Sequence, residues 1–311
     1  MVFSLAVAVV VSAWLAVALI SWLAHEADTG NAALDARKHA AMDQTLSVAE
    51  NSSYEEAFSV QGCITHELRL LPPNELPIPP LQAPLPGKIG DSARLAIVID
   101  DLGENMNAVR QLLRLPYPVT FAILPRSSHA RESAEAGHAA GRQIIVHQPM
   151  EPLGYPERKS VLGVLQTGDS SQAIEQVLQQ SFAAVPHAVG LNNHMGSRFT
   201  QNNAAARAVV SVVKERNLFV LDSVTHPASV LYAQARRHGV PSAKRDIFLD
   251  VTQTKEAVLA QLLQAEKLAL LTGRAVAIGH PHAETLAALQ EWAGIRNRQV
   301  EAVPLRALME P

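Results

Sequence analysis

The side chains most able to do chemistry in this sequence are carboxylates and imidazoles, which occur in short polar segments between apolar runs. These candidates are Asp100, Asp101, His147, Glu151, His194, His280 and His282. Oxygen and imidazole donors without thiolates suit Zn²⁺ or another divalent transition metal. The chain has a single cysteine, Cys63, which excludes an internal disulfide and a cysteine-rich zinc site. The sequence therefore predicts a functional metal site built from histidine and aspartate.

The two adjacent aspartates follow an uninterrupted apolar run over residues 95–99. Such a run is typical of a strand that is buried on both faces of a parallel sheet. Ligand and catalytic groups gather at the carboxyl ends of such strands. Because neighbouring side chains on a strand point in opposite directions, Asp100 and Asp101 need two different roles or a turn that re-aims one of them. The alternative is an Asp-Asp-x-Gly turn that caps the next helix.

Apolar runs alternate with helical patterns from residue 94 onward, which indicates βαβ units and a largely parallel sheet. We expect strands at 95–99, 119–124, 143–146, 188–191, 218–221, 246–249 and 275–278, with an eighth at 300–303. We expect helices near 105–114, 129–140, 170–185, 202–216, 228–238, 253–271 and 283–294. These repeats are sufficient to close a barrel, and a doubly wound open sheet is the alternative. No glycine-rich phosphate-binding motif follows the first strand, which argues against a nucleotide ligand.

Further polar residues stand at the ends of the expected strands. Asp222 follows the fifth strand, and Arg245 and Asp246 begin the sixth. In a parallel barrel the carboxyl ends of all strands lie on one rim, so polar residues that are far apart in the sequence converge there. Structural roles are the alternative. Asp222 could cap a helix, residues 192–193 could form a turn, and Arg245 could simply pair with Asp246.

Four regions are expected along the chain. Residues 1–25 are predicted to be an uncleaved signal anchor, or alternatively a signal peptide, because residues 2–24 lack charged side chains and are long enough to cross a bilayer. Residues 26–70 are predicted to form a polar stalk, residues 71–90 a proline-rich linker, and residues 91–311 the barrel domain. The barrel is then expected on the periplasmic side of the cell envelope. The formal net charge of −3, without a basic stripe, argues against nucleic acid as a partner.

Residues 94–308 resemble the divergent polysaccharide deacetylase family and, more distantly, the main polysaccharide deacetylases. The segments that carry the resemblance are IDDLG at 99–103, HQPME at 147–151, NNHMGS at 192–197, RDIFLD at 245–250 and AIGHPH at 277–282. The resemblance implies an irregular (β/α)7 barrel that uses a divalent metal, expected to be Zn²⁺, to hydrolyse an N-acetyl group. It also implies an N-acetylated polysaccharide or peptidoglycan-like glycan of the envelope as the substrate.

The resemblance further implies roles for the residues of the site. The first motif of the main family has a base aspartate followed by a metal-binding aspartate, which match Asp100 and Asp101. His147 matches the first of two histidines that are spaced four residues apart in that family. The second position is Glu151 in this chain. The third ligand is therefore expected to be His194, with Glu151 as the alternative.

His280 matches the late histidine of the family, which acts as the acid toward the leaving amine. Asp222 or Asp246 could orient His280, or Arg245 could hold Asp100, and the sequence does not choose between these. Candidate substrate contacts are Asn193, His282 and Asp246.

The missing second histidine favours a different class of function. A barrel without catalytic activity could bind a glycan or a protein partner in the envelope. A metal-dependent esterase or phosphoesterase with similar ligands is a third reading.

Overall fold

The computed structural model describes residues 93–154 and 163–309. The signal segment expected at 1–25, the stalk expected at 26–70 and the linker expected at 71–90 lie outside the described residues. Among the helices of the described ranges, none combines the length and the apolar character that a bilayer-spanning helix requires.

The described residues form one curled sheet of parallel strands. The strands are β1 (Ala93–Leu102), β2 (Thr120–Ile123), β3 (Gln143–Met150), β4 (Ala188–Met195), β5 (Phe219–Asp222), β6 (Ser242–Lys244), β7 (Ile247–Phe248), β8 (Arg274–Gly279) and β9 (Val300–Ala302). Eight of them follow the order β6-β5-β4-β3-β2-β1-β8-β7, and β9 pairs with β1 off this path. Every pairing is parallel, which confirms the predicted α/β class.

The sheet is a curled half-barrel, an incomplete form of the irregular (β/α)7 barrel that the resemblance implied. Its two ends are β6 and β7, and within the described strands no ladder of hydrogen bonds joins them. Only two residues separate these strands. The Arg245 backbone N–H donates to the Asp222 carbonyl on β5, and the Asp246 N–H donates to the Val276 carbonyl on β8. The backbone thus passes from hydrogen bonding with β5 to hydrogen bonding with β8 within two residues. We call this junction between β6 and β7, which are not paired with each other, the seam.

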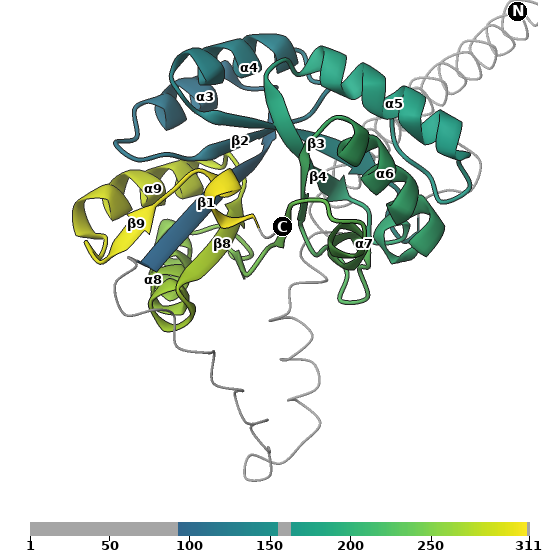
Figure 1. Ribbon diagram of the computed structural model, residues 1–311. Coiled ribbons are helices and arrows are strands. Elements are labelled where there is room, and N and C mark those ends of the chain that lie inside the picture. The colour runs from purple at the N-terminus through teal and green to yellow at the C-terminus, as the bar shows by residue number, and fades with distance from the viewer. Residues whose placement is uncertain (1–92, 155–162, 310–311) are drawn as a thin grey trace, which may run out of the picture. The chain divides into compact units, whose positions relative to one another are not determined.

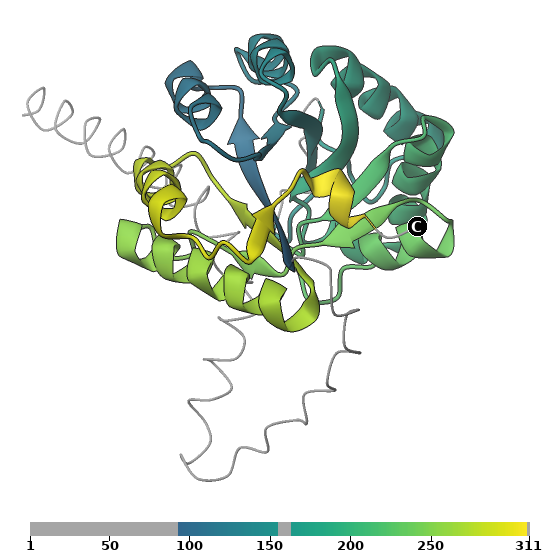
Figure 2. The ribbon, with the colours of Figure 1, turned by 60° about the vertical axis from the view of Figure 1, so that its left-hand side comes forward.

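Seven α-helices and two 3₁₀ helices accompany the described strands. They are α3 (Met106–Leu113), α4 (Ala130–Ala139), α5 (Ser171–Ala184), η1 (Phe199–Gln201), α6 (Asn203–Glu215), α7 (Leu231–Arg237), α8 (Lys255–Thr272), α9 (Ala283–Ile295) and η2 (Leu305–Leu308). The α-helices surround the strands (Figures 1 and 2). Several begin at side-chain caps: Asn105, Ser170, Asn202 and Thr254 each accept a hydrogen bond from a backbone N–H of the first turn.

The strands are buried on both faces, and their side chains alternate between two apolar clusters. On β1, Leu95, Ile97 and Ile99 pack with the helices outside the sheet. Ala96 and Val98 face the interior of the half-barrel, where Leu305 of η2 also packs. Residues of even number on β1 therefore point inward, and this parity brings Asp100 to the inner face.

The elements differ from the sequence prediction at two kinds of place. The strand β6 was missed, because its three residues carry no apolar run. The strands expected to end at residues 146 and 191 continue to Met150 and Met195. Consequently His147 and His194 lie within strands, where pairing fixes their backbone, rather than in the loops that follow.

Candidate metal centre

The candidate site lies on the inner face of the half-barrel, at the carboxyl ends of its strands. The alternation of side chains along each strand places the residues of the site on this face. Ile145 of β3 and Ile278 of β8 face the interior cluster, and the residues two positions later are His147 and His280. On β4, Leu191 faces the helices, so Asn192 and His194 point inward. The convergence predicted from the sequence for histidines at separate strand ends is therefore what the structure has.

Asp101 reaches the same face as Asp100 through an unusual backbone conformation. Its φ is +54°, in the left-handed region that residues other than glycine rarely adopt. The register of β1 against β2 also shifts between Ile99 and Leu102, which marks an irregularity in the strand. The left-handed residue re-aims the Asp101 side chain, so both neighbouring carboxylates face the histidines.

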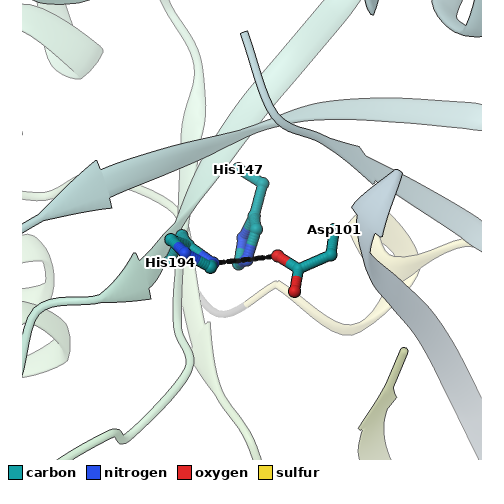
Figure 3. Close-up of side chains that lie close together, drawn as sticks. All are labelled: Asp101, His147 and His194. Carbon is teal, nitrogen blue, oxygen red and sulfur yellow. Dashed lines mark hydrogen bonds and ion pairs between the residues drawn. The ribbon is translucent and has the colours of Figure 1, made fainter. Parts of the chain in front are cut away.

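Asp101, His147 and His194 bring one donor atom each to a single point (Figure 3). Asp101 Oδ1 lies 2.8 Å from His194 Nδ1 and 3.1 Å from His147 Nε2. The two imidazole nitrogens are 3.2 Å apart. Ligands about 2.0–2.1 Å from a tetrahedral zinc ion are separated from one another by roughly 3.3 Å. The three donors are therefore spaced as neighbouring ligands of one ion would be.

Asn192 bridges His147 of this cluster and Asp100 through hydrogen bonds of its side-chain amide. Its Oδ1 lies 2.8 Å from His147 Nδ1, and its Nδ2 donates to Asp100 Oδ1 at 2.8 Å and to Ser223 Oγ at 3.1 Å. The amide oxygen assigns the proton of His147 to Nδ1, which leaves the Nε2 lone pair facing Asp101. Ligating histidines in metalloproteins are held in this way, so the donor set fits a divalent metal.

The buried ionisable side chains of the site shift one another's pKa values. Burial raises the pKa of Asp100 above its ordinary value. Burial acts on Asp101 in the same direction, but His194 and His147 hold the pKa of that carboxyl well below its ordinary value. Burial opposes a charge on His147, yet Asp100 and Asp101 raise its pKa to about 9. The metal-free site thus keeps a proton on His147 at neutral pH, in a position where a bound cation would displace it.

His280 stands on the other side of Asp101. Its Nε2 lies 3.9 Å from Asp101 Oδ2, and its Nδ1 lies 3.0 Å from Asp250 Oδ1. Asp250 also accepts hydrogen bonds from the His280 backbone N–H and from the Thr285 hydroxyl. The Asp250 carboxylate is buried and fixes the orientation of the His280 ring.

The sequence prediction of which carboxylate orients His280 is corrected by these contacts. Asp250 lies against His280, whereas Asp222 faces outward. Its carboxylate accepts hydrogen bonds from the Val224 N–H, the Tyr232 N–H and the Ser229 hydroxyl. Asp222 therefore holds the loop and first turn around α7, as the helix-cap alternative proposed. Asp222 points away from the site because side chains alternate along a strand and the preceding residue, Leu221 of β5, faces the interior.

Asp246 and Arg245 also lie apart from the metal cluster. Asp246 accepts a hydrogen bond from the Val276 N–H, three residues before the end of β8, so it stands toward the amino ends of the strands, away from the predicted substrate position. Arg245 donates to the carbonyls of Ser223 and Val224, and its guanidinium lies over the Phe248 ring at 4.8 Å. These contacts brace the loop after β5.

The other three predicted residues divide between structural positions and the rim. Asn193 is buried, accepts from the Ser223 N–H and donates to the Met195 carbonyl, so it braces two strand ends rather than facing a substrate. Glu151 accepts from Thr167 and pairs with Arg198, and it lies outside the metal cluster, which removes it as the alternative ligand. His282 does lie at the rim, with its ring centroid 5.8 Å from that of His280.

Sequence reasoning missed Asn192 as a site residue and gave Asp250 no role. A usable signal was present for Asn192. It precedes His194 by two residues, so on a strand both side chains must share a face. No comparable signal marked Asp250, because its pairing with His280 depends on where β7 and β8 lie in the sheet.

A curled parallel sheet with helices around it, and with two imidazoles and a carboxylate meeting at the carboxyl rim, defines the class. It is an α/β half-barrel with a candidate metal centre at its strand ends. The chain belongs to the divergent polysaccharide deacetylase family, whose sequence profile matches residues 97–309. The resemblance noted from the motifs is thereby confirmed.

Three similar proteins have names that state no function. The protein YibQ of Escherichia coli is 39% identical over 201 residues, which cover 64% of this chain and 62% of that protein, less than two thirds of its length. A protein of Haemophilus influenzae is 35% identical over 205 residues, covering 66% of this chain and 72% of that one. The crystal structure of a protein from Agrobacterium tumefaciens C58 has a TM-score of 0.66 and 27% identity, covering 73% of this chain and 93% of that one.

Proposed function

We propose that this protein is a metal-dependent hydrolase that removes N-acetyl groups from a glycan of the cell envelope. The observation that carries the proposal is the cluster of Asp101, His147 and His194, whose donor atoms have the spacing of ligands of one ion. A second carboxylate, Asp100, lies beside it, with Oδ2 3.7 Å from His147 Nε2. Membership of the divergent polysaccharide deacetylase family supports the class of reaction.

The cluster suits zinc, because neutral imidazole and carboxylate donors without thiolates are its usual ligands in hydrolytic sites. A divalent ion held by these residues supplies Lewis acidity toward a carbonyl oxygen and lowers the pKa of water. His147 contributes Nε2, and Asn192 keeps its other nitrogen protonated. His194 contributes Nδ1 and Asp101 one carboxylate oxygen.

Asp100 is the proposed base. Its raised pKa, caused by burial, favours acceptance of a proton from the water that adds to the acetamide carbon. The Asn192 amide holds one carboxylate oxygen, and the other remains toward the cluster. His280 is the proposed acid. It delivers a proton to the amine nitrogen as the carbon–nitrogen bond breaks, so that acetate and a free amine leave.

The proposed location is the periplasmic side of the envelope. Residues 2–24 carry no charged side chain, which supports a signal anchor or an exported signal peptide. A reporter enzyme that is active only outside the cytoplasm, fused after residue 311, should be active. Fractionation should recover the full-length protein with the membranes if the segment is an uncleaved anchor.

The central test measures metal content and acetate release on the same purified protein. Wild-type protein should bind one equivalent of Zn²⁺ after dialysis, and Asp101→Ala should bind none. Acetate should be released from N-acetylated glycan fragments only when metal is present. Asp100→Asn should keep the metal and lose the acetate release, because it removes the base without removing a ligand.

Two outcomes would contradict the proposal in different ways. A wild-type protein that binds no divalent metal would remove the metal centre itself. A protein that binds metal but releases acetate from no glycan would favour the barrel without catalytic activity, with the rim serving as a binding surface.

A further inference from the structure

The helix α8 carries large apolar side chains on both of its sides. Val258, Leu262 and Ala269 are buried against the sheet. On the outer side, Leu263 and Leu270 lie two turns apart and are 43% and 44% exposed, among polar residues. Exposed leucines that recur on one side of a helix need an explanation.

The exposed apolar side chains of the described residues all gather at this place. Leu271 of α8 is 62% exposed, and Ile295, the last residue of α9, is 53% exposed. The end of α9 is tied to α8, because Glu266 accepts hydrogen bonds from Trp292 Nε1 and the Asn297 N–H. We call the group Leu263, Leu270, Leu271 and Ile295 the α8 patch. Scattered single leucines on a surface are ordinary, but a patch on one element marks a contact surface.

The cations beside the α8 patch are Lys267 and Arg298. Two exposed carboxylates of the same two helices, Glu256 and Glu291, are both paired with Lys255. Lys267 lies between Leu263 and Leu270 on the same side of the helix and is exposed. The one carboxylate in the second half of α8, Glu266, is buried and bonded inward. Arg298 follows the end of α9 and is exposed. Leucines flanked by lysine and arginine are the composition of surfaces that lie on anionic lipid.

The chain that precedes the domain joins it at the same place. The Arg94 N–H donates to the carbonyl of Gly273, the residue that follows α8, at 3.0 Å. The start of β1 therefore lies beside the end of α8, as Figure 1 shows. The first described residues of the domain thus lie beside the end of α8, and the uncharged segment 2–24 precedes them in the sequence.

We propose that the α8 patch rests on the surface of an anionic lipid bilayer, with the leucines inserted among the lipid head groups and Lys267 and Arg298 paired with phosphates. The inference rests on the proposed membrane location, which brings the domain to the bilayer, and it is independent of the deacetylase activity. Docking on one flank would fix the orientation of the catalytic rim relative to the membrane.

The test places an environment-sensitive fluorophore on the full-length protein in lipid nanodiscs. Cys63 is changed to serine, and one probe position is introduced by Leu271→Cys. The matched control is Gln180→Cys on α5, which is also exposed and packs on β3 and α6, away from α8. The nanodiscs contain phosphatidylcholine alone or with phosphatidylglycerol, and a fraction of the lipids carries a quencher.

The probe at 271 should shift to shorter wavelength and lose most of its emission to the lipid quencher when phosphatidylglycerol is present, whereas the probe at 180 should not. Lys267→Glu with Arg298→Glu should weaken the docking, by about fivefold for each cation removed. Leu263→Gln with Leu270→Gln should abolish the quenching.

Other results would overturn the proposal and identify what failed. If the protein stays with the nanodiscs but the two probes are quenched equally, the anchor holds and the α8 patch does not dock. If the protein is not recovered with the nanodiscs, both the anchor and the patch fail. A probe at 271 that shifts without lipid, together with a dimer in sedimentation, would show that a second copy covers the patch.

Discussion

One backbone torsion, the φ angle of Asp101, allows the side chains of Asp100 and Asp101 to face the interior of the half-barrel together. In a regular strand the two side chains would point to opposite faces, one inward and one toward the helices. The left-handed φ of Asp101 turns its carboxylate back to the inner face. Backbone strain of this kind is commonly retained at functional sites, where it costs about 1–3 kcal/mol. From the sequence, adjacent aspartates on a strand needed either two roles on opposite faces or a turn that re-aims one side chain. The structure has the turn.

Asn192 is the residue whose removal should separate metal binding from fold stability. Asn192→Leu removes the partner of His147 Nδ1 and of Asp100 Oδ1, so metal affinity should fall about 10- to 100-fold. Isothermal titration with Zn²⁺ measures this. The matched control is Asn193→Leu on the same strand, which should lower the free energy of unfolding and leave metal affinity within about threefold of wild type. Equal losses of affinity in the two variants would contradict the role given to Asn192.

The protonation of His147 makes a prediction about pH for the metal-free protein. The pKa of His147 is about 9 in the folded state, above the ordinary value near 6.5. The stabilisation from its charge is therefore fully present below pH 6.5 and is lost as the pH rises through 9. Urea unfolding in EDTA should show that the difference in stability between wild type and His147→Gln shrinks between these pH values. A difference that does not shrink over this range would mean that folding does not raise the pKa of His147.

At the scale of single elements, the turn after β1 constrains the site most tightly. Gly103 has a φ of +122°, and a Cβ at this position would lie 1.8 Å from Ser127 Oγ and 2.8 Å from its Cβ. Its carbonyl accepts the His129 N–H, which fixes the loop before α4. The glycine of the IDDLG segment is thus needed for both conformation and space, close to Asp101 of the candidate metal cluster.

Gly103→Ala should therefore cost more stability than an alanine at another left-handed glycine. Gly141 has a φ of +72° and no atom within 4 Å of the position of a Cβ, so Gly141→Ala bears only the conformational cost, about 1 kcal/mol. Gly103→Ala adds the clash with Ser127 and should cost about 2–4 kcal/mol and weaken metal binding. Chemical denaturation of the two variants measures the difference. Similar losses in both would show that the Ser127 side chain moves aside freely.

The elements were largely predictable from the sequence, and the directions of their side chains were not. Alternation of apolar runs and helical faces gave each helix and each strand except β6. Because the strands are buried on both faces, apolar residues occupy consecutive positions and no alternation marks the inner face. The predictions for Asp222 and Asn193 failed for this reason, since each lies one residue away from an inward-facing position. The side chains of His147, His194 and His280 converge because each occupies an inward-facing position at the end of its strand.

At the scale of the whole molecule, the metal cluster links three strands, β1, β3 and β4. An ion bound only by the folded state should stabilise the domain, by about 2.7 kcal/mol at a free concentration 100 times the dissociation constant. Added Zn²⁺ should raise the midpoint of thermal unfolding of wild type and of Glu151→Gln, because Glu151 lies outside the cluster. Asp101→Ala should show no shift. A lost shift in Glu151→Gln would restore that residue as a ligand.

The closure of the barrel could not be predicted from the sequence. The count of repeats is compatible with a closed barrel or an open sheet, and what decides between them is the two-residue passage from β6 to β7. Those two residues, Arg245 and Asp246, looked like candidates for chemistry. Their backbone N–H groups bond to β5 and β8, the Arg245 side chain binds carbonyls that follow β5, and the Asp246 carboxylate binds the Val276 N–H of β8.

The central place of β1 also governs the order in which the molecule can be built. One edge of β1 pairs with β2, which follows within thirty residues, and with β9, while the other edge pairs with β8, near the end of the chain. During synthesis or export, β1 therefore keeps one edge without its native partner until residues 274–279 arrive. Assembly of the candidate centre cannot be completed earlier than this, because His280 follows β8 directly. A truncated or stalled chain would thus lack His280 and expose an unpaired strand edge, which favours aggregation and recognition by chaperones.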